Sequence, residues 1–507
     1  MTCILTLDIG TTSVKTCLFD DRLHLLDYAN EEYELIAKDG MIELCPDTYW
    51  QAVKNGIRAV LKGRGRDIVA ITATTQGETL IPVDEKGDYL RNAIVWLDGR
   101  AEKEALAIKE HFDDATFYRK TGLPEVGGCC PVSKLLWIKN NQPAVYEKTH
   151  RFLLLEDYII AKLTGEYVTE AALVTSTGYY DINRDMYWSE LLEAMGLDVD
   201  KLPGVLDSGT VVSRIRPDVA DELGISRDAQ VTTGAMDQLA GAVGAGNVAP
   251  GVVTETTGTA LVIGATTDKP DYTHPARAII YRHVRPGNFL IIPICMTAGI
   301  VLKWFKDEFC KLEAAQCEKE GTSVYDVLGE MAATVPPLSE GLLLFPHFTG
   351  MLMPQRDLNA RGVFFGVGLD TKMPHFVRAI FESVAYMLRE NIEVIEELGV
   401  DAKRILSLGG GSKSPVWLQI KADVLGKEIV NMDKAEAASL GAAILGGVAV
   451  GVFESLEQGF NIGNAVRRSF KPNQDVVQLY QKGFIRYKQL YEHIKPMFRE
   501  SQTNMND

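Results

Sequence analysis

Hydrophobic and polar residues at the start of the chain form three short runs with turn residues between them. Ile4–Leu7 and Val14–Phe19 have the composition of strands and flank a glycine-containing turn. A third run, Leu23–Tyr28, follows the turn at Asp20–Arg22. Consecutive strands joined by tight turns predict an antiparallel meander.

Apolar positions with helical spacing then alternate with short apolar runs. Such an alternation predicts an α/β domain with layers of helices and strands. The predicted strand is Ile68–Thr72, and the predicted helices are Thr48–Lys62, Ala101–His111, Val132–Asn140 and Tyr158–Leu163.

The second half of the chain contains a similar hairpin at Gly251–Ala265, again with a turn of small residues between β-rich runs. From Phe376 onward the pattern is mostly helical, apart from a strand at Ile405–Leu408. Val476–Phe498 predicts a charged amphipathic helix. The two hairpins are the one internal repeat that we infer.

A length of 507 residues exceeds what one hydrophobic core usually supports, so we expect two or more domains. The segment GNVAPG, Gly246–Gly251, has the composition of a boundary. We therefore place an N-terminal domain at residues 1–247 and a C-terminal domain at residues 248–507.

The net charge of −16 argues against a nucleic-acid or membrane partner, because both need clustered Lys and Arg. The eight cysteines contain no CxxC pair, which favours reduced thiols in a cytoplasmic protein. The N-terminus lacks the features of a signal peptide. Leu440–Phe453 is shorter than the roughly 20 residues that span a bilayer, so we expect a tightly packed buried helix there.

Two Gly-Thr turns are candidate phosphate sites. In LDIGTTSVKTCLFD, Asp8 ends a strand, and Gly10, Thr11 and Thr12 offer N–H groups and hydroxyls at the turn. A carboxylate at this position could hold Mg²⁺ through water. Thr256–Thr259 forms a similar turn, and two such turns could hold one polyphosphate. The alternative for each is an ordinary hairpin turn.

A glycine-rich loop, Gly409–Ser412, follows an apolar strand and precedes a helix that begins near Pro415. Glycines allow the backbone to lie close to a flat ligand such as adenine. The loop does not fit GxxxxGK(S/T), so it is not a Walker A loop, and the chain does not open with a dinucleotide fingerprint. A plain strand-to-helix loop is the alternative.

Asp237 is the one charged residue between Gly234 and Gly246. A carboxylate among small and apolar residues costs free energy unless it is paired or used. It is therefore a candidate catalytic base, and the alternative is the N-cap of the following helix.

Candidate sugar-binding residues follow two other predicted strands. They are Gln76, Gly77 and Glu78 after one strand, and Trp96 and Asp98 after the next. Amides, carboxylates and an aromatic face suit a polyol pocket. The alternative is a solvated turn and a half-buried core tryptophan.

Together these segments resemble the FGGY family of carbohydrate kinases, from Leu5 to about Phe453. The family's first signature is similar to Pro131–Trp137, although Cys129 departs from it, and its second is similar to Gly362–Glu382. The resemblance implies an α/β fold of two actin-like, ribonuclease H-like ATPase domains with the active site in the cleft between them.

The resemblance also implies roles for individual residues. Asp237 falls on the general base, which accepts the proton of the attacking hydroxyl. The cofactors are ATP and Mg²⁺, with Asp8 and Asp237 as the metal residues. The sugar-binding residues are Gln76, Gly77, Glu78, Trp96, Asp98, Asp237 and Gln238. The nucleotide-binding residues are Gly10, Thr11, Thr12, Lys15, Thr257, Gly258, Thr259, Gly299, Gly410, Gly411 and Ser412.

Signals for the subfamily conflict. TTQGETLIPVD and NAIVWLDGR are similar to glycerol kinases, but Gly77 replaces their arginine. LLEDYIIAKLTGEYVTE and NARGVFFG are similar to xylulose kinases, but Gly77-Glu78 replaces their Met-His pair and Glu156 stands where many carry lysine. Gly350–Pro354 also lacks the Glu-Arg of the usual xylulose kinase loop.

We therefore expect a kinase acting on an open-chain sugar or polyol, with a pentulose such as xylulose as the acceptor and glycerol or another polyol as the alternative. An actin-superfamily ATPase acting as a chaperone or filament protein is the alternative from another class. A homodimer and a monomer both stay open.

Overall fold

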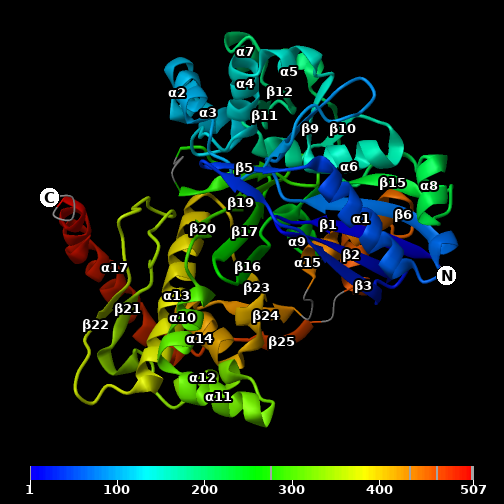
Figure 1. The fold of residues 1–507 in the computed structure, drawn as a ribbon. Helices are drawn as coiled ribbons and strands as arrows, with labels where there is room; N and C mark the ends of the chain where they lie inside the picture. Colours follow the sequence, from blue (N-terminus) through cyan, green and yellow to red (C-terminus); the bar gives the residue numbers. More distant parts are fainter. Residues whose placement is uncertain (1, 274–276, 433–435, 464–465, 504–507) are drawn as a thin grey trace. The chain divides into compact units, whose positions relative to one another are not determined.

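The computed structural model describes residues 2–273, 277–432, 436–463 and 466–503, which form two compact units of mixed α/β structure (Figure 1). Unit 1 contains Met1–Val248, Ile279–Leu290 and Glu436–Asn464; unit 2 contains Ala249–Ala278, Ile291–Ala435 and Ala465–Asp507. The predicted boundary between residues 247 and 248 lies beside the point where the chain first passes from unit 1 to unit 2. Two later segments return to unit 1.

Unit 1 is built on a six-stranded sheet whose members, in spatial order, are β14 (Val211–Arg214), β15 (Gln230–Met236), β6 (Ile68–Thr75), β1 (Cys3–Ile9), β2 (Ser13–Asp20) and β3 (Leu25–Glu32). The antiparallel pairing of β1 with β2 and of β2 with β3 confirms the predicted meander. β1 pairs in parallel with β6, and β6 pairs in parallel with β15. β1 and β15 therefore run in the same direction.

Side chains of β1 alternate between two buried faces, because helices cover both sides of this sheet. Leu5 and Leu7 join a core cluster with residues of α1 (Pro46–Leu61) and α6 (Leu155–Thr164). Ile4 faces the other way, where it lies close to Gly447 of α15 (Ala437–Ala449). Asp8 shares the face of Ile4, since side chains two apart point to the same side of a strand.

Glycines allow close packing of α15 on α9 (Asp237–Gly244). A Cβ atom on Gly441 would lie 1.8 Å from the carbonyl oxygen of Ala240, and one on Gly244 would lie 2.0 Å from that of Ala437. The prediction of a tightly packed buried helix in this region is confirmed.

The predicted helices of the first half are also confirmed as α1, α2 (Glu102–His111), α4 (Pro131–Asn141) and α6. Several short helices were not predicted, because one or two turns give too little periodicity to recognise. They are α3 (Asp114–Thr121), α5 (Pro143–Lys148), α7 (Ser189–Ala194), α8 (Pro217–Leu223) and α16 (Leu456–Gly463).

A second sheet of unit 1 positions the segments that carry the candidate sugar-binding residues. Its strands, in spatial order, are β4 (Ile36–Lys38), β5 (Met41–Leu44), β8 (Ala93–Ile94), β7 (Leu80–Val83) and β9 (Arg151–Leu154). Gln76–Glu78 connects β6 to β7, and Trp96 follows β8. Unit 1 also contains β10 (Val168–Glu170), β11 (Tyr180–Asp181), β12 (Met186–Tyr187), β13 (Gly204–Leu206) and β18 (Ile279–Arg282).

Unit 2 repeats the local topology of β1, β2 and β6. Its neighbouring strands are β17 (Leu261–Thr267), β16 (Val253–Thr257), β23 (Arg404–Leu408), β24 (Glu428–Met432) and β25 (Val466–Phe470). β16 pairs antiparallel with β17 and parallel with β23, as β1 does with β2 and β6. The predicted repeat of the two hairpins is therefore confirmed.

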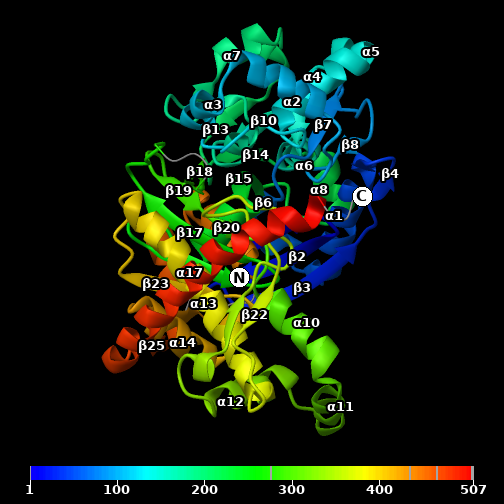
Figure 2. The same ribbon diagram turned by 90° about the vertical axis from the view of Figure 1, so that its left-hand side faces the viewer.

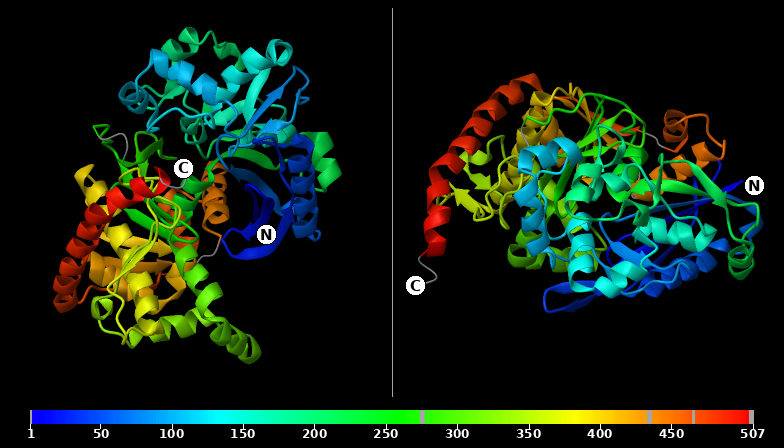
Figure 3. Two further views of the ribbon diagram at one scale, coloured as in Figure 1. Left: turned by 60° about the vertical axis from the view of Figure 1, so that its left-hand side comes forward. Right: turned by 90° about the horizontal axis from the view of Figure 1, so that it is seen from above.

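Long helices pack against one another within unit 2 (Figures 2 and 3). α17 (Gln474–Thr503) confirms the predicted C-terminal helix and contacts α14 (Pro415–Leu425) and α13 (Met373–Glu397). None of the helices in the described part of the chain is long and apolar enough to cross a membrane. The helices of unit 2 are α10 (Gly299–Phe309), α11 (Lys311–Glu320), α12 (Val324–Ala333), α13 (Met373–Glu397), α14 (Pro415–Leu425) and α17 (Gln474–Thr503).

Candidate functional site

Asp237 is the first residue of α9 and directly follows β15. Met236 occupies the N-cap position, and the Asp237 carboxylate accepts a hydrogen bond at 2.8 Å from the N–H of the exposed Gln238. The N-cap alternative therefore does not describe this side chain. Burial and the charge of Asp8 raise the pKa of the half-buried Asp237 to about 7. A carboxylate with a pKa near neutrality suits a general base.

Asp8 lies near Asp237 and is opposite Lys15 in the β1–β2 pair. Burial raises the pKa of Asp8, although Lys15, 3.8 Å away, favours its ionised form. Lys15 also forms an ion pair with Glu436 at 3.1 Å. Two carboxylates close together supply the hard oxygen ligands that Mg²⁺ prefers, and the ion would relieve their repulsion. The residues present thus fit a hydrated Mg²⁺.

The first Gly-Thr turn is braced by its own backbone and by Tyr33. The N–H of Gly10 donates to the carbonyl of Ser13 at 2.9 Å, and the Tyr33 hydroxyl donates to the carbonyl of Gly10 at 2.5 Å. The Thr11 hydroxyl accepts a hydrogen bond at 3.0 Å from the indole N–H of Trp96, whose side chain is 37% exposed. The structure thus links the candidate phosphate turn to a candidate sugar-binding residue.

Gln76 and Gly77 differ in the space around them. Gln76 is buried, and its amide oxygen has no hydrogen-bond partner among the described residues. A Cβ atom on Gly77 would lie 2.8 Å from the sulfur of Met236 and 3.2 Å from the hydroxyl of Ser176. An arginine, as glycerol kinases carry, would therefore require Met236 to move.

Glu78 adopts a left-handed backbone conformation, with φ of 67°. For a residue other than glycine this conformation costs free energy, and such strain occurs often at functional sites. Burial raises the pKa of its carboxyl group to about 8, although Lys134 favours the ionised form and Asp237 adds to the increase. Glu78 can therefore carry a proton near neutral pH and donate a hydrogen bond.

Lys134 of α4 connects the two segments that carry candidate sugar-binding residues. Its side chain is fully buried, and its ammonium group donates to the carbonyl oxygens of Glu78 at 3.1 Å and Val95 at 2.9 Å. Val95 immediately precedes Trp96. One lysine thus holds the backbone beside Glu78 and beside Trp96.

For the kinase activity that the family resemblance implies, replacing Lys134 by methionine is expected to raise KM for the sugar or polyol roughly 10-fold or more, since two buried carbonyls lose a charged donor worth about 1.5–3 kcal/mol. KM for ATP should change much less, because the hydrogen bonds of Lys134 go to the backbone of Glu78 and Val95 and not to a candidate nucleotide-binding residue. Steady-state kinetics with each substrate varied in turn measures both. Lys162→Met on α6 is the control. Equal increases in both KM values would contradict the prediction.

Asp98 does not fit the expected sugar contact. It is fully buried, and its carboxylate accepts hydrogen bonds from the backbone N–H groups of Ile42 and Arg100 and from two nitrogens of the Arg100 side chain. Burial opposes ionisation, but the Arg100 hydrogen bonds hold the pKa of Asp98 below its ordinary value. Asp98 thus stabilises its own loop. The sequence alone could not show that Arg100 uses both oxygens of this carboxylate as hydrogen-bond acceptors.

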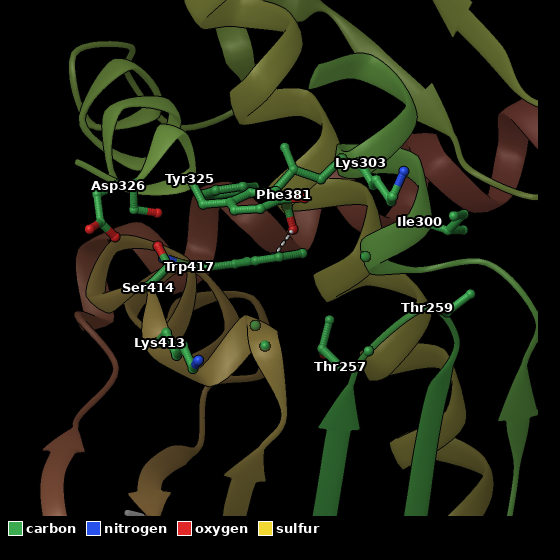
Figure 4. Close-up of a pocket in the computed structure, with 16 residues that line it drawn as sticks. Thr257, Thr259, Ile300, Lys303, Tyr325, Asp326, Phe381, Lys413, Ser414 and Trp417 are labelled. Atoms are coloured by element: carbon green, nitrogen blue, oxygen red, sulfur yellow. Dashed lines mark hydrogen bonds between the residues drawn. The ribbon is translucent and has the colours of Figure 1, made fainter. Parts of the chain in front are cut away.

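Unit 2 contains a cavity of about 400 Å³ (Figure 4). Six of the seven candidate nucleotide-binding residues of this unit line it: Thr257, Gly258, Thr259, Gly299, Gly410 and Gly411. Ser412 does not, and its hydroxyl donates to the carbonyl of Gly409 at 2.8 Å, which shapes the loop from within. The second Gly-Thr turn and the glycine loop, far apart in sequence, therefore lie on one cavity.

Aromatic side chains form much of the remaining wall, which suits a flat base. Phe381 and Trp417 are stacked, with ring centroids 4.4 Å apart and an interplanar angle of 6°. Sequence reasoning missed these residues, because each lies on a helix whose periodicity indicates core packing. The missed lining residues are Ile300, Leu302, Lys303, Ser323, Tyr325, Asp326, Phe381, Lys413, Ser414 and Trp417.

A buried ion pair lies beneath the second Gly-Thr turn. Lys421 and Glu255 are both fully buried and 2.7 Å apart. The Thr257 hydroxyl donates to Glu255 at 2.7 Å and accepts from Lys421 at 2.8 Å. Since its hydroxyl is occupied in this way, Thr257 offers its backbone and methyl group to the cavity.

Comparison with known proteins identifies the family. Sequence profiles of the FGGY family of carbohydrate kinases match twice: the N-terminal domain at residues 3–244 and the C-terminal domain at residues 253–450. The chain belongs to this family. The resemblance drawn from the signatures is thereby confirmed.

FGGY kinases of known function are similar over almost the whole chain. Xylulose kinase of Bacillus subtilis (strain 168) is 28% identical over 97% of each chain. Gluconokinase of the same organism is 30% identical over 90% of this chain and 89% of its own. The crystal structure of ligand-bound xylulose kinase from Lactobacillus acidophilus has a TM-score of 0.88 and 25% identity, covering 99% of this chain and 100% of that one.

The protein is thus a phosphotransferase with an alcohol group as acceptor: an FGGY kinase that uses ATP and acts on a sugar or polyol. The alternative of a chaperone or filament ATPase was wrong. None of the eight cysteines forms a disulfide in the structure.

Proposed function

We propose that the protein transfers the γ-phosphoryl group of MgATP to a hydroxyl of an uncharged open-chain sugar or polyol, with Asp237 as general base. A pentulose such as xylulose is the favoured acceptor, and glycerol or another polyol is the alternative. The observation that carries the proposal is the place of Asp237 at the start of α9, within electrostatic range of Asp8 and Glu78. One neighbour belongs to the proposed phosphate turn and the other to the proposed sugar-binding segment.

Each proposed residue has a role that follows from its chemistry. Asp237 accepts the proton of the acceptor hydroxyl and orients its oxygen toward the γ-phosphorus. Gly10, Thr11 and Thr12, with Lys15, contact phosphate oxygens, while the cavity of unit 2 holds the nucleoside. Asp8 and Asp237 would hold Mg²⁺ through water, and the ion would supply positive charge beside the phosphates. No cluster of three metal-binding side chains occurs among the described residues, which suits an ion completed by water and phosphate.

The charges of the proposed sugar-binding residues support an uncharged acceptor. Gln76, Gly77, Trp96 and Gln238 are uncharged, Asp237 is acidic, and Glu78 can carry a proton near neutral pH. The nearby cation, Lys134, is buried and donates to two backbone carbonyls. A substrate carboxylate, as in gluconate, would lie near the Asp237 carboxylate without a cationic partner among the proposed sugar-binding residues, which is unfavourable.

The proposal is tested by coupled ADP release with a panel of acceptors: xylulose, ribulose, glycerol, erythritol and gluconate. A pentulose should give the highest kcat/KM, at least about 10-fold above gluconate, because one unpaired buried charge costs a few kcal/mol. Removal of divalent metal should abolish turnover, and added Mg²⁺ should restore it. A preference for gluconate would contradict the charge argument, and absence of turnover with every acceptor would contradict the substrate class.

The homodimer stays a prediction. The proposed chemistry does not require it, because every proposed residue belongs to one chain. Light scattering of the purified protein measures the assembly directly.

A further inference from the structure

The end of β15 that leads into Asp237 is irregular. β15 pairs with β14 as far as Thr232, and the N–H of Thr233 still donates to the carbonyl of Thr210, just before β14, at 2.9 Å. The register of β15 with β6 shifts between Thr232 and Ala235. Gly234 lies so close to β6 that a Cβ atom would be 1.7 Å from the carbonyl oxygen of Ala73. The backbone therefore cannot move closer to β6. The N–H groups of Gly234 and Met236 must find acceptors elsewhere.

Two glutamates accept hydrogen bonds from this stretch of backbone. Glu156 of α6 accepts the N–H of Gly234 at 2.8 Å, and Glu170 of β10 accepts the N–H of Met236 at 3.2 Å. Both glutamates are fully buried. Gly234 lies three residues before Asp237, and Met236 lies one residue before it. The two glutamates therefore hold the backbone segment that sets the position of Asp237.

The two carboxyl groups differ in their other partners. Glu170 also accepts the N–H groups of Ala172 and Leu173 and the hydroxyl of Ser208, a set of donors that favours its ionised form. The second oxygen of Glu156 has no hydrogen-bond partner among the described residues, and burial and Glu170 raise its pKa well above the ordinary value. Burial also raises the pKa of Glu170, to about 7, although its hydrogen bonds favour the ionised form.

A third buried carboxylate nearby has a different function. Asp157 accepts the backbone N–H of Leu154 at 2.8 Å at the start of α6, and in the described part of the chain it has no hydrogen bond to β15. It stabilises the helix that carries Glu156, so it offers a matched control.

We propose that Glu156 and Glu170 are positioning residues for Asp237. Their hydrogen bonds to Gly234 and Met236 replace the neighbouring strand that β15 lacks at this end, and fix the backbone from which Asp237 projects. This inference rests on the proposed role of Asp237 as base. Both glutamates are fully buried, so their expected effect is on the backbone and not through contact with a substrate.

Glu156→Leu removes the acceptor for the N–H of Gly234. Glu170→Gln replaces one acceptor oxygen by an NH₂ donor, which faces groups that also donate. Each is expected to lower kcat roughly 10- to 100-fold, because a small displacement of a reacting group has an effect of this order. KM for ATP should stay unchanged. Glu156→Gln keeps an acceptor oxygen and should recover most of the kcat lost in Glu156→Leu. Asp157→Asn should lower Tm without lowering kcat.

Steady-state kinetics and thermal unfolding of the full-length variants test whether Glu156 and Glu170 position Asp237. Wild-type kcat in both Glu156→Leu and Glu170→Gln overturns the positioning role, as does a loss of kcat in Asp157→Asn equal to theirs. If Glu156→Leu does not fold, the near-isosteric Glu170→Gln gives the decisive value. Wild-type kcat in Asp237→Asn would instead contradict the proposed base, so the two failures are distinguishable.

Discussion

Replacing Asp237 by asparagine is expected to lower kcat roughly 10²- to 10⁴-fold, the usual contribution of a general base. Asparagine has nearly the same shape, and its amide oxygen can still accept the N–H of Gln238, so the start of α9 should stay intact. It cannot take a proton from the acceptor hydroxyl. Rates of ADP release at saturating acceptor and ATP measure the effect.

Asp218→Asn is the matched control for this experiment. Asp218 also lies in the first turn of a helix, α8, but its carboxylate is exposed and pairs with Arg216. If kcat falls equally in both variants, the loss reflects the helix start and not proton transfer. A kcat of more than half the wild-type value in Asp237→Asn would contradict the role of Asp237 as the general base.

Much of the fold could be predicted because it depends on local patterns. Strand-like runs on either side of a small-residue turn predicted both hairpins, and each forms as expected in its unit. The return of Ile279–Leu290 and Glu436–Asn464 to unit 1 could not be predicted in this way. It depends on contacts such as Gly441 against Ala240, between residues distant in the sequence.

In the candidate site, too, the residues that could be predicted are those with a local sequence pattern. Gly-Thr turns, the glycine loop and a lone aspartate are local features, and the structure brings six of the residues of unit 2 to one cavity. Phe381 and Trp417 could not be assigned, since a buried aromatic on a helix has the same pattern whether it contacts ligand or core. Asp98 could not be excluded, because its saturation by Arg100 depends on side-chain geometry.

The buried pair beneath the second Gly-Thr turn leads to the other large expected effect. Replacing Lys421 by methionine leaves the Glu255 carboxylate fully buried without its cation. Removing one partner of such a pair costs about 3–5 kcal/mol of the free energy of unfolding. Thr257 also loses the donor that fixes its hydroxyl, so nucleotide affinity should fall as well. Urea unfolding and ATP titration measure the two effects.

Two further variants separate the loss of charge from the loss of packing. Glu255→Leu combined with Lys421→Met removes both charges, and should recover most of the stability, since apolar residues of similar volume can replace a buried pair. Lys427→Met breaks a pair with Glu396 in which both side chains are partly exposed, and should cost about 1 kcal/mol or less. If Lys421→Met costs no more than Lys427→Met, the buried pair does not stabilise the floor of the nucleotide cavity. If the double variant is the least stable of the three, desolvation of Glu255 is not the cause of the loss.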